Sequence, residues 1–326
     1  MSLIEFSFII IGKNIAKTLP DVFAELKKLS LLQSLDLKII YVDSDSNDSS
    51  LTIAKSFRTD NPLLQIKIFQ IYGDINSAIA RNVGINNLDS QTEYVFFLDG
   101  DIVFNKDFLI EAIKILEINS NFASVTGQII DSFDELSNIT ENRPSPFAKV
   151  DSLILWHGGN FVIKKTVLDK VGIFDIHLVK HQDIDFCFKI RNKGFSLWKT
   201  KTLLGIHHTT SYMNHNRIFN DIKEKKFISS GILFRKYIFT KRCIDMLKSI
   251  NGIVIRFCIL MLFVLSLIHL FFLMLSAIFI VYWISKTKLS KGETYTSRLL
   301  SLASGLQFFW GILKKRKKLS YTVKAF

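Results

Sequence analysis

Four short apolar runs divide the first third of the chain, and they limit the fold more than any other feature of the sequence. They are rich in β-branched and aromatic residues and span residues 6–11, 38–42, 66–71 and 94–99. Such runs are typical of buried strands, and the segments between them have the amphipathic spacing of helices. Strands that alternate with helices form a parallel sheet covered on both faces. The sequence therefore predicts an α/β fold with a mostly parallel central sheet.

Polar residues follow three of these predicted strands. Asn14, Asp43 and Asp99 stand at or just after the carboxyl ends of the strands, and sheets of this kind bind ligands beyond that edge. Asp99 and Asp101 form an Asp-Gly-Asp triplet whose two carboxylates project to the same side. Hard oxygen ligands of this kind suit Mg²⁺ or Mn²⁺ bridged to a diphosphate. The triplet alone leaves a plain turn open, because Asp-Gly is a common turn dipeptide.

The positive charge of the chain is concentrated near its C-terminal end. Residues 241–326 hold 14 Lys and Arg but only two acidic residues, Asp245 and Glu293, so this segment accounts for nearly all of the net charge of +13. The basic clusters flank an apolar stretch and show no aromatic-interleaved basic face or nucleic-acid-reading motif. We therefore expect anionic membrane lipid, and no nucleic acid, as the partner of this segment.

The apolar stretch itself covers residues 257–285, which include no Asp, Glu, Lys or Arg. Its 29 residues exceed the roughly 20 that cross a bilayer as a helix. Basic residues flank both ends, whereas a single span favours positive charge on the cytoplasmic side. The sequence favours a re-entrant or interfacial hairpin and leaves one tilted span as the alternative.

A second membrane-prone segment, residues 298–318, groups Leu, Phe and Trp310 before a basic cluster. It predicts a helix lying on anionic lipid, and the alternative is a helix packed on the preceding domain. We accordingly expect a catalytic domain at residues 1–245 and a hydrophobic, basic, membrane-associated helical region at residues 246–326. The three cysteines show no CxxC spacing, which argues against a zinc site or a disulfide framework.

Four segments of the chain form an ordered set of motifs: YVDSDSNDSS at 41–50, ARNVG at 80–84, LDGD at 98–101 and the stretch from GGNF to NKGF at 158–195. In this order they resemble the motifs of the family 2 glycosyltransferases of the GT-A fold, of the type that builds bacterial polysaccharides. The third matches the DxD motif of that family. The resemblance covers about the first 210 residues, and four ordered motifs are more specific than any one of them.

The resemblance implies roles for individual residues at the nucleotide end of a site. Asp43 is expected to contact the base of a uracil-type nucleotide, with Asn14 and Arg81 also at the nucleotide. Asp99 is expected at the ribose or the metal, and Asp101 at the metal. His207 is the expected imidazole ligand of that metal, with His208 as the alternative.

The last motif implies the acceptor end. Asp183 is expected to be the catalytic base, although the family often has an acidic residue where this chain has Gln182. Asp185 is expected mainly to cap the helix that follows. The expected sugar or acceptor contacts are Trp156, Gly158, Gly159, Asn160 and Asp185.

Together these features predict an inverting, hexosyltransferase-type enzyme. It would move a sugar from a nucleotide-diphosphate donor, a UDP-sugar, to a hydroxyl of a glycan or lipid-linked acceptor. It would use Mn²⁺ or Mg²⁺ and act at the inner membrane, with its catalytic domain on the cytoplasmic side. One alternative is a nucleotidyltransferase, whose glycine-rich basic signature after the first strand is absent here. The other is a non-catalytic membrane scaffold that retains the fold.

Overall fold

The computed structural model describes residues 4–31, 35–133, 139–142, 151–210, 214–266, 274–275, 277–278, 280–282, 301–315 and 318–326. The chain forms two compact units. Unit 1 comprises Met1–Ile176, Gln182–Thr209 and Lys318–Phe326. Unit 2 comprises His177–His181 and Thr210–Lys317.

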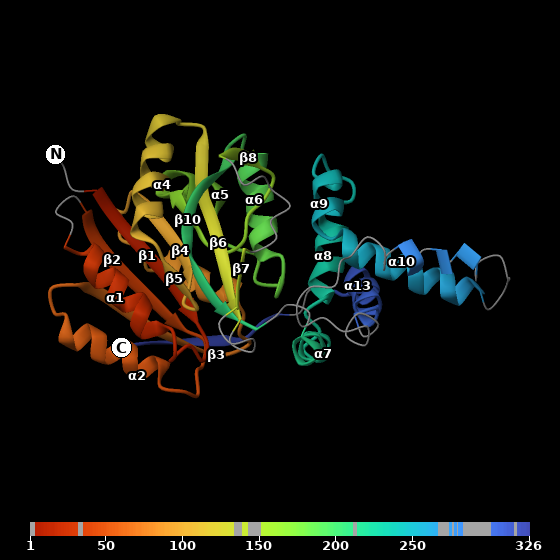
Figure 1. Ribbon diagram of the computed structural model, residues 1–326, viewed down its shortest axis with the longest axis horizontal. Coiled ribbons are helices and arrows are strands. Elements are labelled where there is room, and N and C mark those ends of the chain that lie inside the picture. The colour runs from red at the N-terminus through yellow and green to blue at the C-terminus, as the bar shows by residue number, and fades with distance from the viewer. Residues whose placement is uncertain are drawn as a thin grey trace. The chain divides into compact units, whose positions relative to one another are not determined.

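Unit 1 is built on one sheet, and all four predicted strands are present in it as β1 (Ile4–Gly12), β2 (Leu35–Asp43), β3 (Gln65–Gly73) and β4 (Tyr94–Asp99). These four strands are parallel neighbours in the order β3-β2-β1-β4. Figure 1 shows them side by side in red to orange. The prediction of an α/β fold with a parallel core is confirmed for this half of the sheet.

The other half of the sheet makes it mixed. It continues through β9 (Phe161–Lys164), β6 (Phe122–Phe133), β10 (Ser196–Thr209) and β5 (Ile102–Phe104). β9 is antiparallel to both of its neighbours, and β5 is antiparallel to β10. Two short strands, β7 (Ile139–Asn142) and β8 (Ser152–Ile154), pair with β6 and β10. The antiparallel strands bring later parts of the chain to the edge where β4 ends.

Helices cover both faces of the sheet because side chains alternate along each strand. Phe8 and Ile10 face one core, shared with α1 (Leu19–Leu29), α2 (Ser50–Asp60) and α4 (Lys106–Ile118). Ile9 and Ile11 face the other core, shared with α3 (Ser77–Asn86), α5 (Lys165–Val171) and α6 (Gln182–Asn192). The strands are buried on both sides, which explains their nearly continuous apolar sequence.

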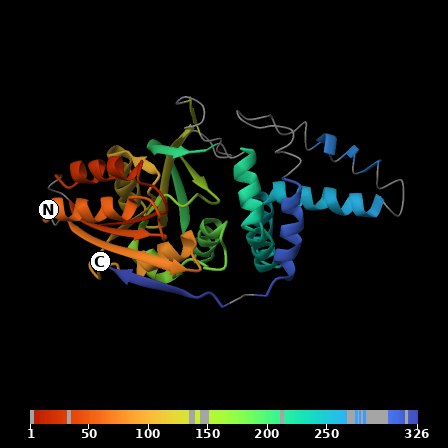
Figure 2. The same cartoon turned by 90° about the horizontal axis from the view of Figure 1, so that it is seen from below.

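The end of the described chain returns to unit 1. Strand β11 (Tyr321–Ala325) adds to the sheet antiparallel to β3, and Figure 2 shows it as the long blue arrow below the sheet. The main segment of unit 2, Thr210–Lys317, is therefore an insertion between two segments of unit 1, and His177–His181 also belongs to unit 2. The predicted division into 1–245 and 246–326 differs from this one at both ends, because local composition carries no sign of a strand that pairs with β3 from a distance.

Unit 2 is helical and consists of α7 (His215–Lys223), α8 (Ile228–Tyr237), α9 (Cys243–Ser249), α10 (Asn251–Ser266) and α13 (Ala303–Leu313) among the described residues. Two glycines allow close helix packing on α13. A Cβ on Gly311 would lie 2.1 Å from the carbonyl oxygen of Ile228 in α8, and one on Gly305 would lie 2.9 Å from the backbone nitrogen of Phe257 in α10.

No single helix among the described residues has both the length and the apolar composition to cross a bilayer. The pair Cys243–Ser249 and Asn251–Leu265, bent by 81°, meets those two criteria only when the helices are taken together. Much of the predicted hairpin or span at 257–285 lies outside the described residues.

Candidate active site

The predicted polar residues of the parallel strands meet at one edge of unit 1. In the sheet register, Gly12 at the end of β1 lies between Asp43 of β2 and the end of β4, where Asp99 is paired with Ile11. Asn14 follows β1 in the left-handed region, with φ of 55°, a conformation that Asn tolerates better than most residues. The carboxyl ends of the parallel strands therefore form the floor of the candidate site.

Asp43 is fully buried at this edge and is held by three hydrogen bonds. Its carboxylate accepts from the Ser46 amide at 2.9 Å, from Gln70 Nε2 at 3.2 Å and from the Tyr41 hydroxyl at 3.2 Å. Burial and the adjacent Asp43 raise the pKa of Tyr41, so the phenol stays a neutral donor. Asn14 stabilises the loop after β2 that contains Ser46, because the backbone N–H of Asn14 donates to Ser46 Oγ at 2.9 Å.

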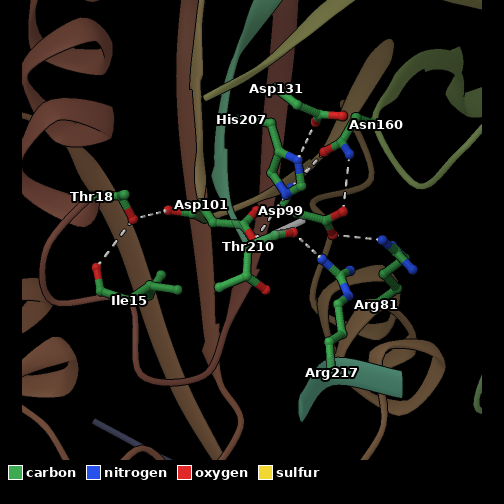
Figure 3. A network of polar contacts seen from close by, with 11 residues as sticks. Ile15, Thr18, Arg81, Asp99, Asp101, Asp131, Asn160, His207, Thr210 and Arg217 are labelled. Carbon is green, nitrogen blue, oxygen red and sulfur yellow. Dashed lines mark hydrogen bonds and ion pairs between the residues drawn. The ribbon is translucent and has the colours of Figure 1, made fainter. Parts of the chain in front are cut away.

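Arg81, Asp99 and Asn160 form a second group, shown in Figure 3. Arg81 comes from α3, whose start is fixed by the Asn76 cap on the Ile79 amide. Its Nη2 lies 2.6 Å from Asp99 Oδ1. Asn160 directly precedes β9, and its amide both donates to Asp99 Oδ2 at 2.9 Å and accepts from the Asp99 amide at 2.7 Å. Both carboxylate oxygens of Asp99 are therefore hydrogen-bonded, and its side chain is fixed beside a buried guanidinium.

Gly159 provides the space for this arrangement. A Cβ at Gly159 would lie 2.0 Å from Arg81 Nη2 and 2.8 Å from its Cζ, which real contacts do not permit. A Cβ at the neighbouring Gly158 would meet only Asp183 Oδ2, at an ordinary 3.9 Å. The two adjacent glycines thus differ sharply in what an added methyl group would disturb.

Replacing Gly159 with Ala is expected to push the Arg81 guanidinium away from Asp99 while leaving the fold intact, because the end of an arginine can move. Loss of a charge-assisted hydrogen bond costs about 1.5–3 kcal/mol, which is roughly tenfold or more in kcat/KM for a nucleotide-sugar donor. The matched control is Gly158→Ala, which should keep most of the activity. Equal kcat/KM for the two variants would contradict this role of Gly159.

Asp101, the second carboxylate of the Asp-Gly-Asp triplet, lies next to His207. Ile102 of β5 pairs with His207 of β10, and this register brings His207 Nε2 to 3.2 Å from Asp101 Oδ2. His207 Nδ1 lies 2.7 Å from Oδ1 of Asp131, a buried residue of β6. His208, the alternative ligand, contacts Asp101 through its backbone amide, which donates to the Asp101 carbonyl at 2.9 Å. The imidazole that faces the triplet is that of His207 (Figure 3).

The side chains around Asp101 fit a divalent cation only in part. Asp101 Oδ1 is buried and has no hydrogen-bond partner among the described residues, and a carboxylate with an imidazole is a suitable ligand pair for Mn²⁺. The described residues hold no group of three or more His, Cys, Asp or Glu side chains placed to bind a metal. Asp99, a predicted ligand, uses both oxygens on Arg81 and Asn160. A cation here would need further ligands, and Mg²⁺ and Mn²⁺ commonly take them from substrate phosphates.

Asp183 lies in the first turn of α6 and is half-buried. Its Oδ1 accepts from the Ile184 amide at 2.9 Å. Burial raises the pKa of Asp183, and the positive charge of Arg81 partly opposes that rise. A carboxylate that binds a proton more readily than usual is suited to act as a general base.

Asp185 does not cap this helix, contrary to the prediction. α6 begins at Gln182, so Asp185 lies within the first turn. Its carboxylate is fully buried, with Oδ2 3.9 Å from Lys189 Nζ. The predicted end of the helix is confirmed, since Gly194 has a φ of 89° just beyond it. The predicted start of the helix was too late in the sequence. Gln182 and Asp183 are compatible both with a first helical turn and with the residues just before a helix, and the sequence pattern does not distinguish these two cases.

The segment before β9 forms the remaining side of the site. Trp156 is half-buried against the core shared with α3 and α6, while Gly158 is exposed. His157 between them is buried, with its Nε2 2.9 Å from Ser124 Oγ and its Nδ1 2.8 Å from the Gly158 carbonyl. Burial lowers the pKa of His157 to about 4, so it is neutral at physiological pH.

Sequence reasoning missed Gln70, Asp131 and His157. Gln70 is a buried polar residue inside an apolar strand run, and this break in the pattern could have marked it. Asp131 and His157 lie in no motif of the resembled family. The contact of Asp131 with His207 joins two strands whose residues are 76 apart, and the contact of His157 with Ser124 joins β6 to the segment before β9.

Residues 7–178, more than half of the chain, match the family described as Glycosyl transferase family 2. The chain belongs to this family. Among curated relatives, it is 23% identical to glycosyltransferase AglE of Haloferax volcanii over 199 residues, which are 58% of this chain and 60% of that protein. It is 36% identical to the minor teichoic acid biosynthesis protein GgaA of Bacillus subtilis over 74 residues, or 23% of this chain and 16% of that protein. The chain thus spans less than two thirds of either relative.

Solved structures of other proteins share this fold. The mannosyltransferase PcManGT from Pyrobaculum calidifontis, in complex with GDP-Man and Mn²⁺, superposes with a TM-score of 0.55 at 15% identity. That match covers 96% of this chain and 88% of PcManGT. S. aureus TarS 1–349 in complex with UDP gives a TM-score of 0.51 at 16% identity, covering 73% of each chain. The mixed sheet of this family 2 glycosyltransferase is therefore a GT-A-like fold.

Proposed function

We propose that this protein is an inverting glycosyltransferase that moves a hexose from a nucleotide-diphosphate donor to an acceptor hydroxyl. The observation that carries the proposal is the position of Asp183. Its carboxylate lies next to Gly158, whose neighbour Gly159 adjoins the Arg81–Asp99 pair at the carboxyl edge of the sheet. A half-buried carboxylate close to the Arg81 guanidinium and to Asp99 is suited to take a proton from a sugar hydroxyl at this edge.

The reaction follows from what these residues do. Asp183 accepts the proton of the acceptor hydroxyl while the hydroxyl oxygen forms a bond to the anomeric carbon of the donor sugar. The bond from that carbon to the diphosphate oxygen breaks, and the nucleoside diphosphate leaves with the electron pair. Attack from the side opposite the leaving group inverts the anomeric centre. Arg81, held by Asp99, provides positive charge at this edge.

We also propose that Mn²⁺ or Mg²⁺ assists the reaction, held by Asp101 and His207. Such a cation would stabilise the negative charge of the departing diphosphate. The support is the unpartnered Asp101 Oδ1 and the adjacent His207 Nε2. The structures of the neighbours are consistent with it, since PcManGT was solved with Mn²⁺.

The proposed donor is a UDP-sugar. Asp43 lies at the end of β2, and its carboxylate accepts from the Ser46 amide in the loop after that strand and from Gln70 of β3. TarS was solved with UDP, whereas PcManGT was solved with GDP-Man. The donors to compare in the experiment are therefore UDP-sugars and GDP-sugars.

The experiment is a thermal-shift screen of UDP- and GDP-sugars with and without Mn²⁺, followed by an assay of nucleotide release. A ligand that binds only the folded state raises Tm. We expect metal-dependent stabilisation by a UDP-sugar and slow hydrolysis of it. Formation of a sugar nucleotide from a sugar phosphate would instead identify a nucleotidyltransferase, and binding without turnover would favour a non-catalytic scaffold.

We further propose that the enzyme acts at the cytoplasmic face of the inner membrane, on a glycan or lipid-linked acceptor. The support within unit 2 is the exposed side of α13. Its large apolar residues recur at helical spacing and are 43–65% exposed, namely Leu306, Phe309, Trp310 and Leu313. The small residues Ser304, Gly305 and Gly311 are buried instead. An apolar face turned outward next to basic residues is typical of helices that lie on anionic lipid.

Replacing Phe309 and Trp310 together with Ser is expected to reduce binding to phosphatidylglycerol vesicles at least tenfold, because both rings lose their contact with lipid. Flotation with vesicles measures this. Leu63→Ser is the matched control, since Leu63 is 96% exposed but lies in unit 1. Equal flotation of the double variant and the wild type would exclude α13 as the lipid-binding surface.

A further inference from the structure

Asp131 is a buried carboxylate at the rim of the candidate site for which the proposed reaction has no direct use. It lies near the end of β6 and is 1% exposed. In the parallel register of β6 and β10 it is the direct partner of His207. Because an ionised carboxylate is costly to bury without a specific partner, its presence at this position calls for a function.

The contacts around His207 indicate what that function is. Asp131 Oδ1 lies 2.7 Å from His207 Nδ1, and Asp101 Oδ2 lies 3.2 Å from His207 Nε2. An ionised carboxylate only accepts hydrogen bonds, so the shorter contact places the proton of the neutral imidazole on Nδ1, and a second proton on Nε2 would make the ring an imidazolium between two carboxylates. The Nε2 lone pair then points at Asp101, as Figure 3 shows for the ring orientation.

Two acceptors that face each other are favourable only when a proton or a metal cation lies between them. Nε2 of His207 and Oδ2 of Asp101 are such a pair when the ring is neutral, and Oδ1 of Asp101 has no hydrogen-bond partner among the described residues. A histidine that binds a metal through one nitrogen commonly donates its other N–H to a carboxylate, which fixes the tautomer and the ring orientation. The Asp131–His207 contact has that arrangement.

We propose that Asp131 is a positioning residue that holds His207 as the Nδ1–H tautomer, so that Nε2 binds a divalent cation together with Asp101. This inference rests on the proposed metal site. Asp131 does not contact the cation and acts only through the imidazole. Its contribution should therefore vanish when His207 is absent, which a merely structural carboxylate would not show.

The test is the apparent Kd of Mn²⁺ at saturating UDP, measured from the electron paramagnetic resonance signal of free Mn²⁺. Asp131→Asn allows the amide to donate to Nδ1 and thus favours the wrong tautomer. We expect the affinity for Mn²⁺ to fall by about 10- to 100-fold, the usual effect of removing such a partner. Asp89→Asn is the matched control, because Asp89 is ion-paired with Lys67 at 2.6 Å at the amino end of β4 and should leave the affinity unchanged.

A double-mutant cycle separates positioning from general damage. Combining Asp131→Asn with His207→Ala should weaken Mn²⁺ binding no further than His207→Ala does alone. Melting in EDTA checks that each variant is folded. An additional loss in the double variant, or wild-type affinity in folded Asp131→Asn, would overturn the proposal.

The tautomer can also be read without replacing Asp131. Long-range ¹H–¹⁵N spectra of the metal-free wild type distinguish an Nδ1–H from an Nε2–H imidazole, and His207→Ala assigns the signal. We expect Nδ1–H, and an Nε2–H tautomer would refute the inference. If the wild type itself binds no Mn²⁺ with UDP, the proposed metal site fails, which is a different outcome from equal binding by wild type and Asp131→Asn.

Discussion

Asp183→Asn is expected to lower the rate of sugar transfer by roughly 10²- to 10⁴-fold, the usual contribution of a general base. The change keeps the size of the side chain and removes its capacity to accept a proton. Affinity for the nucleotide-sugar donor should change little, because the Arg81–Asp99 pair remains intact. Steady-state kinetics with calorimetry of nucleotide-sugar binding would test this, and transfer at a near wild-type rate would contradict the assignment.

Asp185→Asn is the comparison for that experiment. Asp185 is fully buried and faces Lys189, so its replacement should lower Tm while each folded molecule transfers sugar at a rate closer to that of the wild type. A loss of transfer confined to Asp185→Asn would move the role of base to Asp185.

The raised pKa of Asp183 predicts two dependences on pH. Transfer requires the ionised carboxylate, so the rate should fall as the pH drops through that pKa, at a higher pH than for an exposed Asp. Because the pKa is higher in the folded state than in the unfolded chain, ionised Asp183 lowers stability above the folded pKa. Asp183→Asn should therefore be at least as stable as the wild type at neutral pH, with the difference shrinking as the pH falls. A constant difference in Tm from pH 4 to 8 would contradict this.

Asp101→Ala is the second large effect that we expect. It removes the carboxylate that faces His207 and should abolish the part of nucleotide-sugar affinity that depends on Mn²⁺, because the diphosphate charge would be poorly compensated. Affinity measured in EDTA serves as the internal control and should match that of the wild type. Calorimetry with and without Mn²⁺ gives both numbers, and unchanged metal dependence would remove Asp101 from the proposed cation site.

Sequence patterns were enough to predict the parallel half of the fold and the edge at which the candidate site lies. The apolar runs correspond to β1–β4 because strands buried on both faces need apolar residues at every position. Asn14, Asp43 and Asp99 could be placed at one edge, since the carboxyl ends of neighbouring parallel strands meet there. The family resemblance, on four ordered motifs, then led to the family to which the chain belongs.

The pairing of the side chains at that edge became visible only in the folded chain. Asp131 and His207 are 76 residues apart, and Asp99 and Asn160 are 61 apart, so only the strand order β4-β9-β6-β10 brings each pair together. The close approach of Gly159 to Arg81 and the pairing of β11 with β3 also join residues that are far apart in the chain. Local patterns report whether a segment is buried and how it repeats, whereas these contacts depend on the register between strands that are distant in the chain.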